Sequence, residues 1–226
     1  MLEAAGIPVS EYIAFNYAER ELISFSAVKN KLGLPFMVKA ASLGSSVGVS
    51  KVNSEDDFIT ALEDAFRYDE QVIMERYIKG REIECAILGN YPPQASYPGE
   101  IIISDKYEFY TFDAKYVDSE AVQIKVPAEL DKDIAEKIRE LSVKAFKTLH
   151  CQDFARVDLF VDGDDNIYVN EINTIPGFTN SSMYPVMWKE RGISFRDLIT
   201  SLIELALDRY QQNKRIERDF QSTLKF

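Results

Sequence analysis

Apolar and polar residues alternate over residues 154–162 and again over residues 167–173. A period of two is typical of strands that bury one face, and the polar run from Gly163 to Asn166 between them predicts a tight turn. The two segments therefore predict a β-hairpin. Other strands are predicted at 35–40, 47–52, 71–76, 82–88, 99–103 and 121–126.

Helical spacing is clearest over residues 129–149, where Ile134, Ile138 and Leu141 recur on one face. Ser54 followed by Asp57 predicts a capped helix that runs to about Tyr68. Further helices are predicted at 18–32, 183–191 and 195–213. The mixture of paired strands and amphipathic helices predicts an α+β fold, with helices packed on antiparallel sheets.

The composition narrows the class of protein. The 226 residues carry a net charge of −11, which argues against a nucleic-acid partner. No run of 18 apolar residues is present, so we expect no membrane span. Cys85 and Cys151 lack metal-ligand spacing, and this cysteine usage predicts a cytoplasmic protein. The single histidine, His150, argues against a catalytic triad or a multi-histidine metal site.

The predicted hairpin gathers polar side chains on one face. If Asp162 faces the residue after the turn, Ile167, then Asp158 lies opposite Glu171, and Arg156 lies opposite Asn173. Two carboxylates that face each other repel, and a cation between them removes the repulsion. Two carboxylates and an amide oxygen suit Mg²⁺ that also holds substrate phosphates.

A second candidate site is the small-residue loop between the first two predicted strands. Gly44 and Gly48 allow unusual backbone dihedrals, and Ser45 and Ser46 add hydroxyl donors. Lys39, at the end of the preceding strand, can place a positive charge on a phosphate. A phosphate-binding loop and a plain hairpin turn are both compatible with this pattern.

A third segment, residues 75–78, links two predicted strands. Its backbone could pair with an adenine edge, while Glu82 could accept hydrogen bonds from ribose hydroxyls. The alternative is an ordinary solvated strand end.

The order of these candidate segments along the chain resembles that of the ATP-grasp carboxylate–amine ligases. The segments are Lys39, the Gly44–Gly48 loop, Glu75, Arg156-Val-Asp158 and residues 171–177. Residues 39–51, 113–116 and 170–183 are similar, more narrowly, to D-alanine–D-alanine ligases. The similarity runs from about Gly6 to about Asp208, with the segment 170–183 as its most specific part.

The resemblance implies roles for individual residues. It implies a catalytic set made of Arg156, Gly177, Ser45 and Tyr116. It implies a nucleotide-binding set made of Lys39, Ser45, Ser46, Glu75, Tyr77, Ile78, Glu82 and Lys115. It implies Ser182 and Met183 as substrate-binding residues, and Asp158, Glu171 and Asn173 as metal ligands. Ser45 and Tyr116 would form a hydrogen-bonded pair that closes a lid made of roughly residues 104–122.

The resemblance also implies an activity. It is the ATP-dependent ligation of two D-alanines through an acyl phosphate, for peptidoglycan precursors, in a bacterial cytoplasm. The implied cofactors are ATP and two Mg²⁺ ions, with Mn²⁺ as an alternative. The fold would be ATP-grasp, with two α+β subdomains that sandwich ATP. Residues 1–80 would form the smaller subdomain, with the phosphate loop, and residues 81–226 the larger.

The chain differs from this pattern at its start. Members of the family usually carry an N-terminal domain ahead of the position of Gly6. We therefore expect a fragment of a full ligase that binds Mg-ATP but ligates poorly, rather than a subunit completed by a partner. A homodimer stays open, because the missing domain makes much of that contact. Two other functions also stay open: an ATP-grasp ligase with a different acid or amine, and a nucleotide-binding module without turnover.

Overall fold

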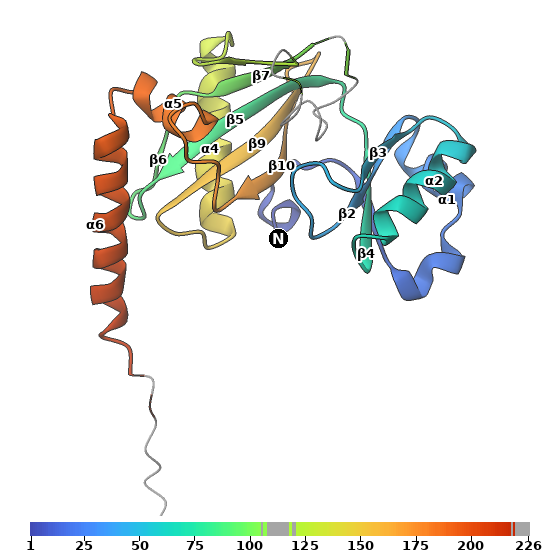
Figure 1. Cartoon of the computed structure of the whole chain (residues 1–226), viewed down its shortest axis with the longest axis horizontal. Helices are drawn as coiled ribbons and strands as arrows, with labels where there is room; N and C mark the ends of the chain where they lie inside the picture. The colour runs from blue at the N-terminus through green and yellow to red at the C-terminus, as the bar shows by residue number, and fades with distance from the viewer. Residues whose placement is uncertain (105, 108–117, 119–120, 218, 220–226) are drawn as a thin grey trace, which may run out of the picture.

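The computed structural model describes residues 1–104, 106–107, 118, 121–217 and 219, and two antiparallel sheets lie side by side in it (Figure 1). The strands are β1 (Tyr12–Asn16), β2 (Phe36–Ala40), β3 (Val49–Val52), β4 (Gln71–Arg76), β5 (Gly80–Leu88), β6 (Gln94–Ala95), β7 (Gly99–Ile103), β8 (Val122–Lys125), β9 (Phe154–Asp162) and β10 (Ile167–Asn173). The helices are η1 (Glu3–Ala5), η2 (Tyr17–Leu22), α1 (Phe25–Leu32), α2 (Glu55–Phe66), α4 (Lys132–Thr148), α5 (Met183–Glu190) and α6 (Phe195–Asn213).

The smaller sheet has the strand order β1-β4-β2-β3, and helices α1 and α2 cover it. Its core is made of apolar side chains from both helices and from the inner face of the strands. Phe25, Phe36 and Phe58 stack at ring-centroid distances of 5.6 to 6.4 Å. Edge-on and tilted aromatic packing of this kind adds stability beyond the buried area.

The larger sheet has the order β10-β9-β5-β7-β8, with β6 paired to β5. Its two faces are covered differently. Helix α4 packs on the face that carries Ile83, Cys85 and Val157. Helices α5 and α6 lie on the other face, against Ala86 and Ile101. The second face is therefore apolar at one end only, and its remaining part holds charged side chains.

The predicted α+β pattern is confirmed in most of its elements, but the single helix expected over residues 18–32 is wrong. A 3-10 turn, η2, ends at Leu22, and α1 begins only after Ser24. Asn16 and Glu19 form a capping box that starts the short turn. Ile23 and Ser24 then adopt extended backbone, which divides the segment in two. Helical propensity was too weak a guide against two competing caps.

The hairpin turn is shifted by one residue from its predicted register. Ile167 pairs with Val161 rather than with Asp162. The Asp162 carboxylate instead accepts hydrogen bonds from the backbone N–H groups of Asp164 and Asn166, both at 2.9 Å. A β-bulge between Val169 and Glu171 then inserts one extra residue. The bulge restores the register for the rest of the hairpin.

The N-terminal segment packs on the larger sheet, although it precedes the strands of the smaller one (Figure 1). Ile7 is buried in the core under α4, and Val9 forms a parallel bridge to Val169. The subdomain division at residues 80 and 81 stays a prediction.

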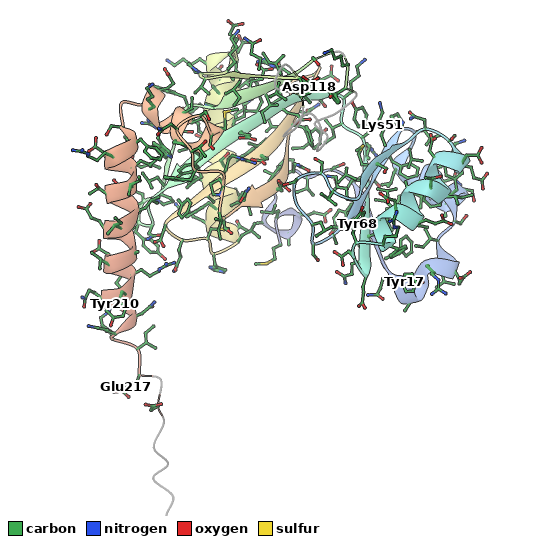
Figure 2. The ribbon with its side chains drawn as sticks, in the orientation of Figure 1. Tyr17, Lys51, Tyr68, Asp118, Tyr210 and Glu217 are labelled. Carbon is green, nitrogen blue, oxygen red and sulfur yellow. The ribbon has the colours of Figure 1, made fainter. Side chains whose placement is uncertain are left out.

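Helix α6 extends past the body of the larger sheet, and Figure 2 shows Tyr210 near its far end. Leu198 is its one buried residue in the described part of the chain. Arg209 holds the helix to the sheet through an ion pair of 2.8 Å with Asp153. Within the described ranges, no helix is both long enough and apolar enough to cross a membrane.

The two cysteines differ in burial, and this difference leads to a prediction. Burial raises the pKa of Cys85 from 9.0 to about 11, and burial also raises the pKa of the half-buried Cys151. We expect iodoacetamide at mildly alkaline pH to alkylate Cys151 well before Cys85, as peptide mass spectrometry would measure. Equal rates would contradict the buried position of Cys85.

The raised pKa of Cys85 also makes the free energy of unfolding depend on pH. The folded protein keeps the Cys85 proton more tightly than the unfolded chain, so this contribution is complete below about pH 9 and is lost as the pH rises toward about 11.

Candidate functional site

The expected metal ligands lie on the charged face of the larger sheet. Asp158 on β9 pairs with Glu171 on β10, and Arg156 pairs with Asn173, so the bulge preserves both predicted pairings. On its other side Asp158 pairs with Glu84 of β5. Three carboxylates therefore stand in one row across three strands, with Arg156 in the next row.

Arg156 binds two of these carboxylates. Its Nε and Nη2 donate to Oδ1 and Oδ2 of Asp158, both at 2.7 Å. Its Nε also lies 3.0 Å from Oε2 of Glu84. Burial by itself lowers the pKa of Arg156, but the hydrogen bonds to Asp158 and the charges of Asp158, Glu84 and Glu171 raise it overall. The guanidinium is therefore a fixed positive charge on this face.

The chemistry of the donors fits a hard divalent cation. Asp158 and Glu171 offer carboxylate oxygens from neighbouring strands, and Asn173 offers an amide oxygen that already accepts from the N–H of Ile175 at 3.1 Å. Mg²⁺ prefers one or two carboxylates and completes its shell with water and phosphate. Among the described residues, no group of three or more His, Cys, Asp or Glu side chains could hold a metal ion by itself. The set thus suits an ion shared with phosphate.

Lys39 joins the two sheets. Its Nζ lies 2.5 Å from Oε2 of Glu75 on β4, and it donates at 3.2 Å to Oδ1 of Asn170 on β10. Both carboxylate and lysine are about one-fifth exposed, so water reaches the pair. Lys39 and Glu75, both expected at the nucleotide, are therefore adjacent, and they stand beside the strand that carries the metal ligands.

The predicted phosphate loop joins β2 to β3, with an unexpected backbone. Ser45 and Ser46 adopt positive φ angles of 57° and 60°, and Gly48 has a φ of 67°. Gly44 is not among the left-handed residues, so the expectation of unusual dihedrals there was wrong. A side chain at Gly48 would meet Ala40 at 3.1 Å and Tyr68 at 3.2 Å, which explains its need for a glycine. Non-glycine residues at positive φ are strained and often functional.

The linker after β4 lies at the junction of the two sheets. Tyr77 and Ile78 are half-buried there, and Lys51 of β3 stands 4.6 Å above the Tyr77 ring. Figure 2 shows Lys51 at the end of the smaller sheet nearest the larger one. Glu82, on β5, points to the same face as Glu84, because residues two apart share a face. The expected adenine residues Tyr77 and Ile78 thus lie in the linker between β4 and β5, and the expected ribose residue follows them on β5.

The expected substrate residues follow β10. The Oγ of Ser182 accepts from the N–H of Thr179 at 3.0 Å and lies 2.8 Å from the Thr179 hydroxyl. A side chain at Gly177 would lie 3.2 Å from Ser182 Oγ. Met183, the first residue of α5, is 5% exposed, and its side chain belongs to the apolar cluster between α5 and the larger sheet. A role for Met183 in binding would have to come from its backbone.

Two of the predicted site residues, Lys115 and Tyr116, lie outside the described residues, and so does most of the expected lid over 104–122. The proposed pair between Ser45 and Tyr116 stays a prediction.

Comparison with known proteins decides the family. The family model for the D-ala D-ala ligase C-terminus matches residues 1–204. The chain belongs to this family. It is 46% identical over 96% of its length to a D-alanine--D-alanine ligase of Shouchella clausii, and 48% identical to D-alanine--D-alanine ligase A of Escherichia coli. These relatives are covered over 58% and 59% of their own length, so the chain spans less than two thirds of them.

Solved structures of the D-alanine ligase family share the fold. A D-alanine-D-alanine ligase from Coxiella burnetii matches with a TM-score of 0.81 and 40% identity, over 95% of this chain and 56% of that one. The VanG D-Ala:D-Ser ligase from Enterococcus faecalis matches with a TM-score of 0.81 and 35% identity, over 90% of this chain and 58% of that one. The predicted α+β, ATP-grasp fold is confirmed.

Two residues of this D-alanine ligase-family site were not predicted from the sequence. Glu84 alternates with Ile83 and Cys85 along β5, so an acidic residue on a charged strand face was a signal that could have been used. Asn170 gave no such signal. Its position beside Lys39 depends on the bulge, which shifts the face of the strand.

Proposed function

We propose that the chain forms the ATP-binding and phosphoryl-transfer part of a ligase that joins two D-alanines through an acyl phosphate, for peptidoglycan precursors. The observation that carries the proposal is the cluster of Arg156, Asp158 and Glu171 on one sheet face, within a chain of this family. The names of its relatives supply the substrate class.

The described residues suggest separate roles in binding ATP, in phosphoryl transfer and in binding the amino acid. Lys39 and the N–H groups around Ser45 and Ser46 bind the phosphates, while Glu75, Tyr77, Ile78 and Glu82 hold the adenosine. Arg156 is charged and is held on this face by carboxylates, so it can stabilise the negative charge that develops on the transferring oxygens. Gly177 lies next to Ser182 after β10. Gly177 can offer a backbone N–H to the reacting group beside Arg156, while Ser182 can orient the second amino acid. Tyr116 and Lys115 complete the set from the expected lid.

Asp158, Glu171 and Asn173 would hold Mg²⁺, which would offset charge on the phosphates of bound ATP. We propose two ions, with Mn²⁺ as an alternative. ATP and D-alanine are the proposed small-molecule partners, and the proposed location is the cytoplasm. A homodimer stays an open alternative. The two proposed subdomains, 1–80 and 81–226, would enclose ATP between the sheets.

The test is isothermal titration of the chain with ATP in Mg²⁺, followed by phosphate release with and without D-alanine. We expect Mg²⁺-dependent ATP binding and little D-alanine-dependent release. We expect Lys39→Met to weaken ATP binding about tenfold to a hundredfold, because a charge-assisted hydrogen bond to phosphate is lost. Phosphate release should also be measured with D-serine as the second amino acid, because one matched structure is a D-Ala:D-Ser ligase.

The control is Lys31→Met, since Lys31 is an exposed lysine on α1. We expect it to bind ATP like the unmodified chain. ATP binding that is unaffected by Lys39→Met would exclude the proposed phosphate contact. Robust dipeptide formation by the purified chain would contradict the expectation of poor ligation, and ATP binding with no amino-acid response would favour a module without turnover.

A further inference from the structure

Glu84 is a buried carboxylate on the site face that the proposed function does not use. It is 5% exposed, and it stands on β5 in register with Asp158. A buried carboxylate is costly unless it is paired. Glu84 forms an ion pair with Arg156, whose Nε lies 3.0 Å from Glu84 Oε2.

Arg156 is shared between the two carboxylates through one nitrogen. The same Nε donates to Asp158 Oδ1 at 2.7 Å, while Nη2 donates to Asp158 Oδ2 at 2.7 Å. Both carboxylate oxygens of Asp158 therefore accept from the guanidinium. A cation that binds Asp158 would use these same oxygens and bring a like charge next to the guanidinium, so it would weaken the hold of Asp158 on Arg156.

The charges on this face also indicate a role for Glu84. The row contains Glu84, Asp158 and Glu171, and Arg156 supplies one positive charge beside it. The carboxylates of this row therefore attract a divalent cation, and Glu84 adds to that attraction. Without the charge of Glu84, the attraction of this face for a divalent cation would be weaker.

We propose that Glu84 is a positioning residue that keeps Arg156 in the site when a divalent cation takes over Asp158. The guanidinium then loses its fork with Asp158 but keeps its ion pair with Glu84, so it stays available to the transferring phosphate. This inference rests on the cation site of the proposed function.

The test measures Mn²⁺ binding to the whole chain by the loss of the free-ion EPR signal. We expect Glu84→Gln to weaken Mn²⁺ binding about tenfold or more, the size typical of residues that support a metal ligand. In the variant, Arg156 loses the charge of Glu84 and depends more on Asp158, which then releases it less readily to a cation. The matched control is Glu100→Gln: Glu100 is 8% exposed, and it pairs with Arg81 at 2.7 and 2.6 Å on the opposite face. We expect its Mn²⁺ affinity to be unchanged.

A second measurement distinguishes the contact between Glu84 and Arg156 from the effect of the Glu84 charge alone. In saturating Mg²⁺, where the cation occupies Asp158, ¹⁵N NMR should show the Arg156 Nε–H protected from exchange in the unmodified chain and exposed in Glu84→Gln. Glu84→Asp keeps the charge but shortens the reach, so we expect it to lose the protection as well. Protection that persists in both variants would overturn the positioning role.

The outcomes distinguish the two proposals. Equal Mn²⁺ affinity in Glu84→Gln and the unmodified chain overturns the inference about Glu84 alone. An equal loss of affinity in Glu100→Gln overturns it too, because the effect would then be structural. Failure of the unmodified chain to bind Mn²⁺ overturns the proposed cation site and this inference together.

Discussion

Replacing Arg156 by methionine is expected to lower the free energy of unfolding by about 3 kcal/mol in the absence of divalent cations. The Arg156 side chain is 18% exposed, and its partners Glu84 and Asp158 are 6% and 15% exposed. Removal of the guanidinium leaves two mostly buried carboxylates without it, beside a third in the same row. We expect saturating Mg²⁺ to restore part of the loss, because the cation supplies the missing positive charge. Urea unfolding with EDTA and with Mg²⁺ measures both effects.

Arg81→Met is the control for this experiment. Arg81 also holds a carboxylate through two hydrogen bonds, but it lies on the opposite face and its side chain is 38% exposed. We expect a smaller loss of stability and no recovery in Mg²⁺. If Mg²⁺ stabilised both variants equally, the ion would act on the whole surface rather than at the Asp158 row. A variant as stable as the unmodified chain would show that Arg156 adds nothing to folding.

The metal-ligand face could be predicted from the sequence because strand periodicity is short and strict. Residues two apart in a strand share a face. Arg156 and Asp158 therefore point to one face of their strand, and Glu171 and Asn173 point to one face of theirs. Their pairing across the hairpin was predicted from a turn that was wrong by one residue. The bulge after Val169 cancelled that error. The prediction was thus correct at the site for a reason that the pattern did not contain.

Contacts between the two sheets could not be predicted in this way. Lys39 meets Asn170 across 131 positions of sequence, and neither residue shows a periodic signal for the other. Arg156 can pair with Glu84 only because β5 lies next to β9 in the sheet. The sequence of either strand does not specify that order. Local patterns specify faces and ends of elements, while the neighbour of each strand is set by the packing of the whole sheet.

The largest packing effect is expected at Trp188, the one tryptophan of the chain. Its side chain is fully buried under α5, among Met187, Leu198 and Ala86. Trp188→Ala should lower the free energy of unfolding by about 3–5 kcal/mol, because lost burial and an unfilled cavity add together. That loss approaches the whole stability of a marginal domain. Urea unfolding followed by far-UV circular dichroism measures it, since the fluorescence probe is removed with the side chain.

Trp188→Phe is the matched variant, because it keeps an aromatic ring in the cavity. We expect a loss of about 1–2 kcal/mol for phenylalanine, well below that for alanine. Since α5 begins directly after Ser182, the alanine variant should also loosen the segment that carries the proposed substrate contacts. Hydrogen exchange of the amides around Thr179 and Ser182 would then be faster in the alanine variant than in the phenylalanine variant. Equal losses of stability for the two variants would mean that the ring does not fill this core, and that α5 is held in place by other contacts.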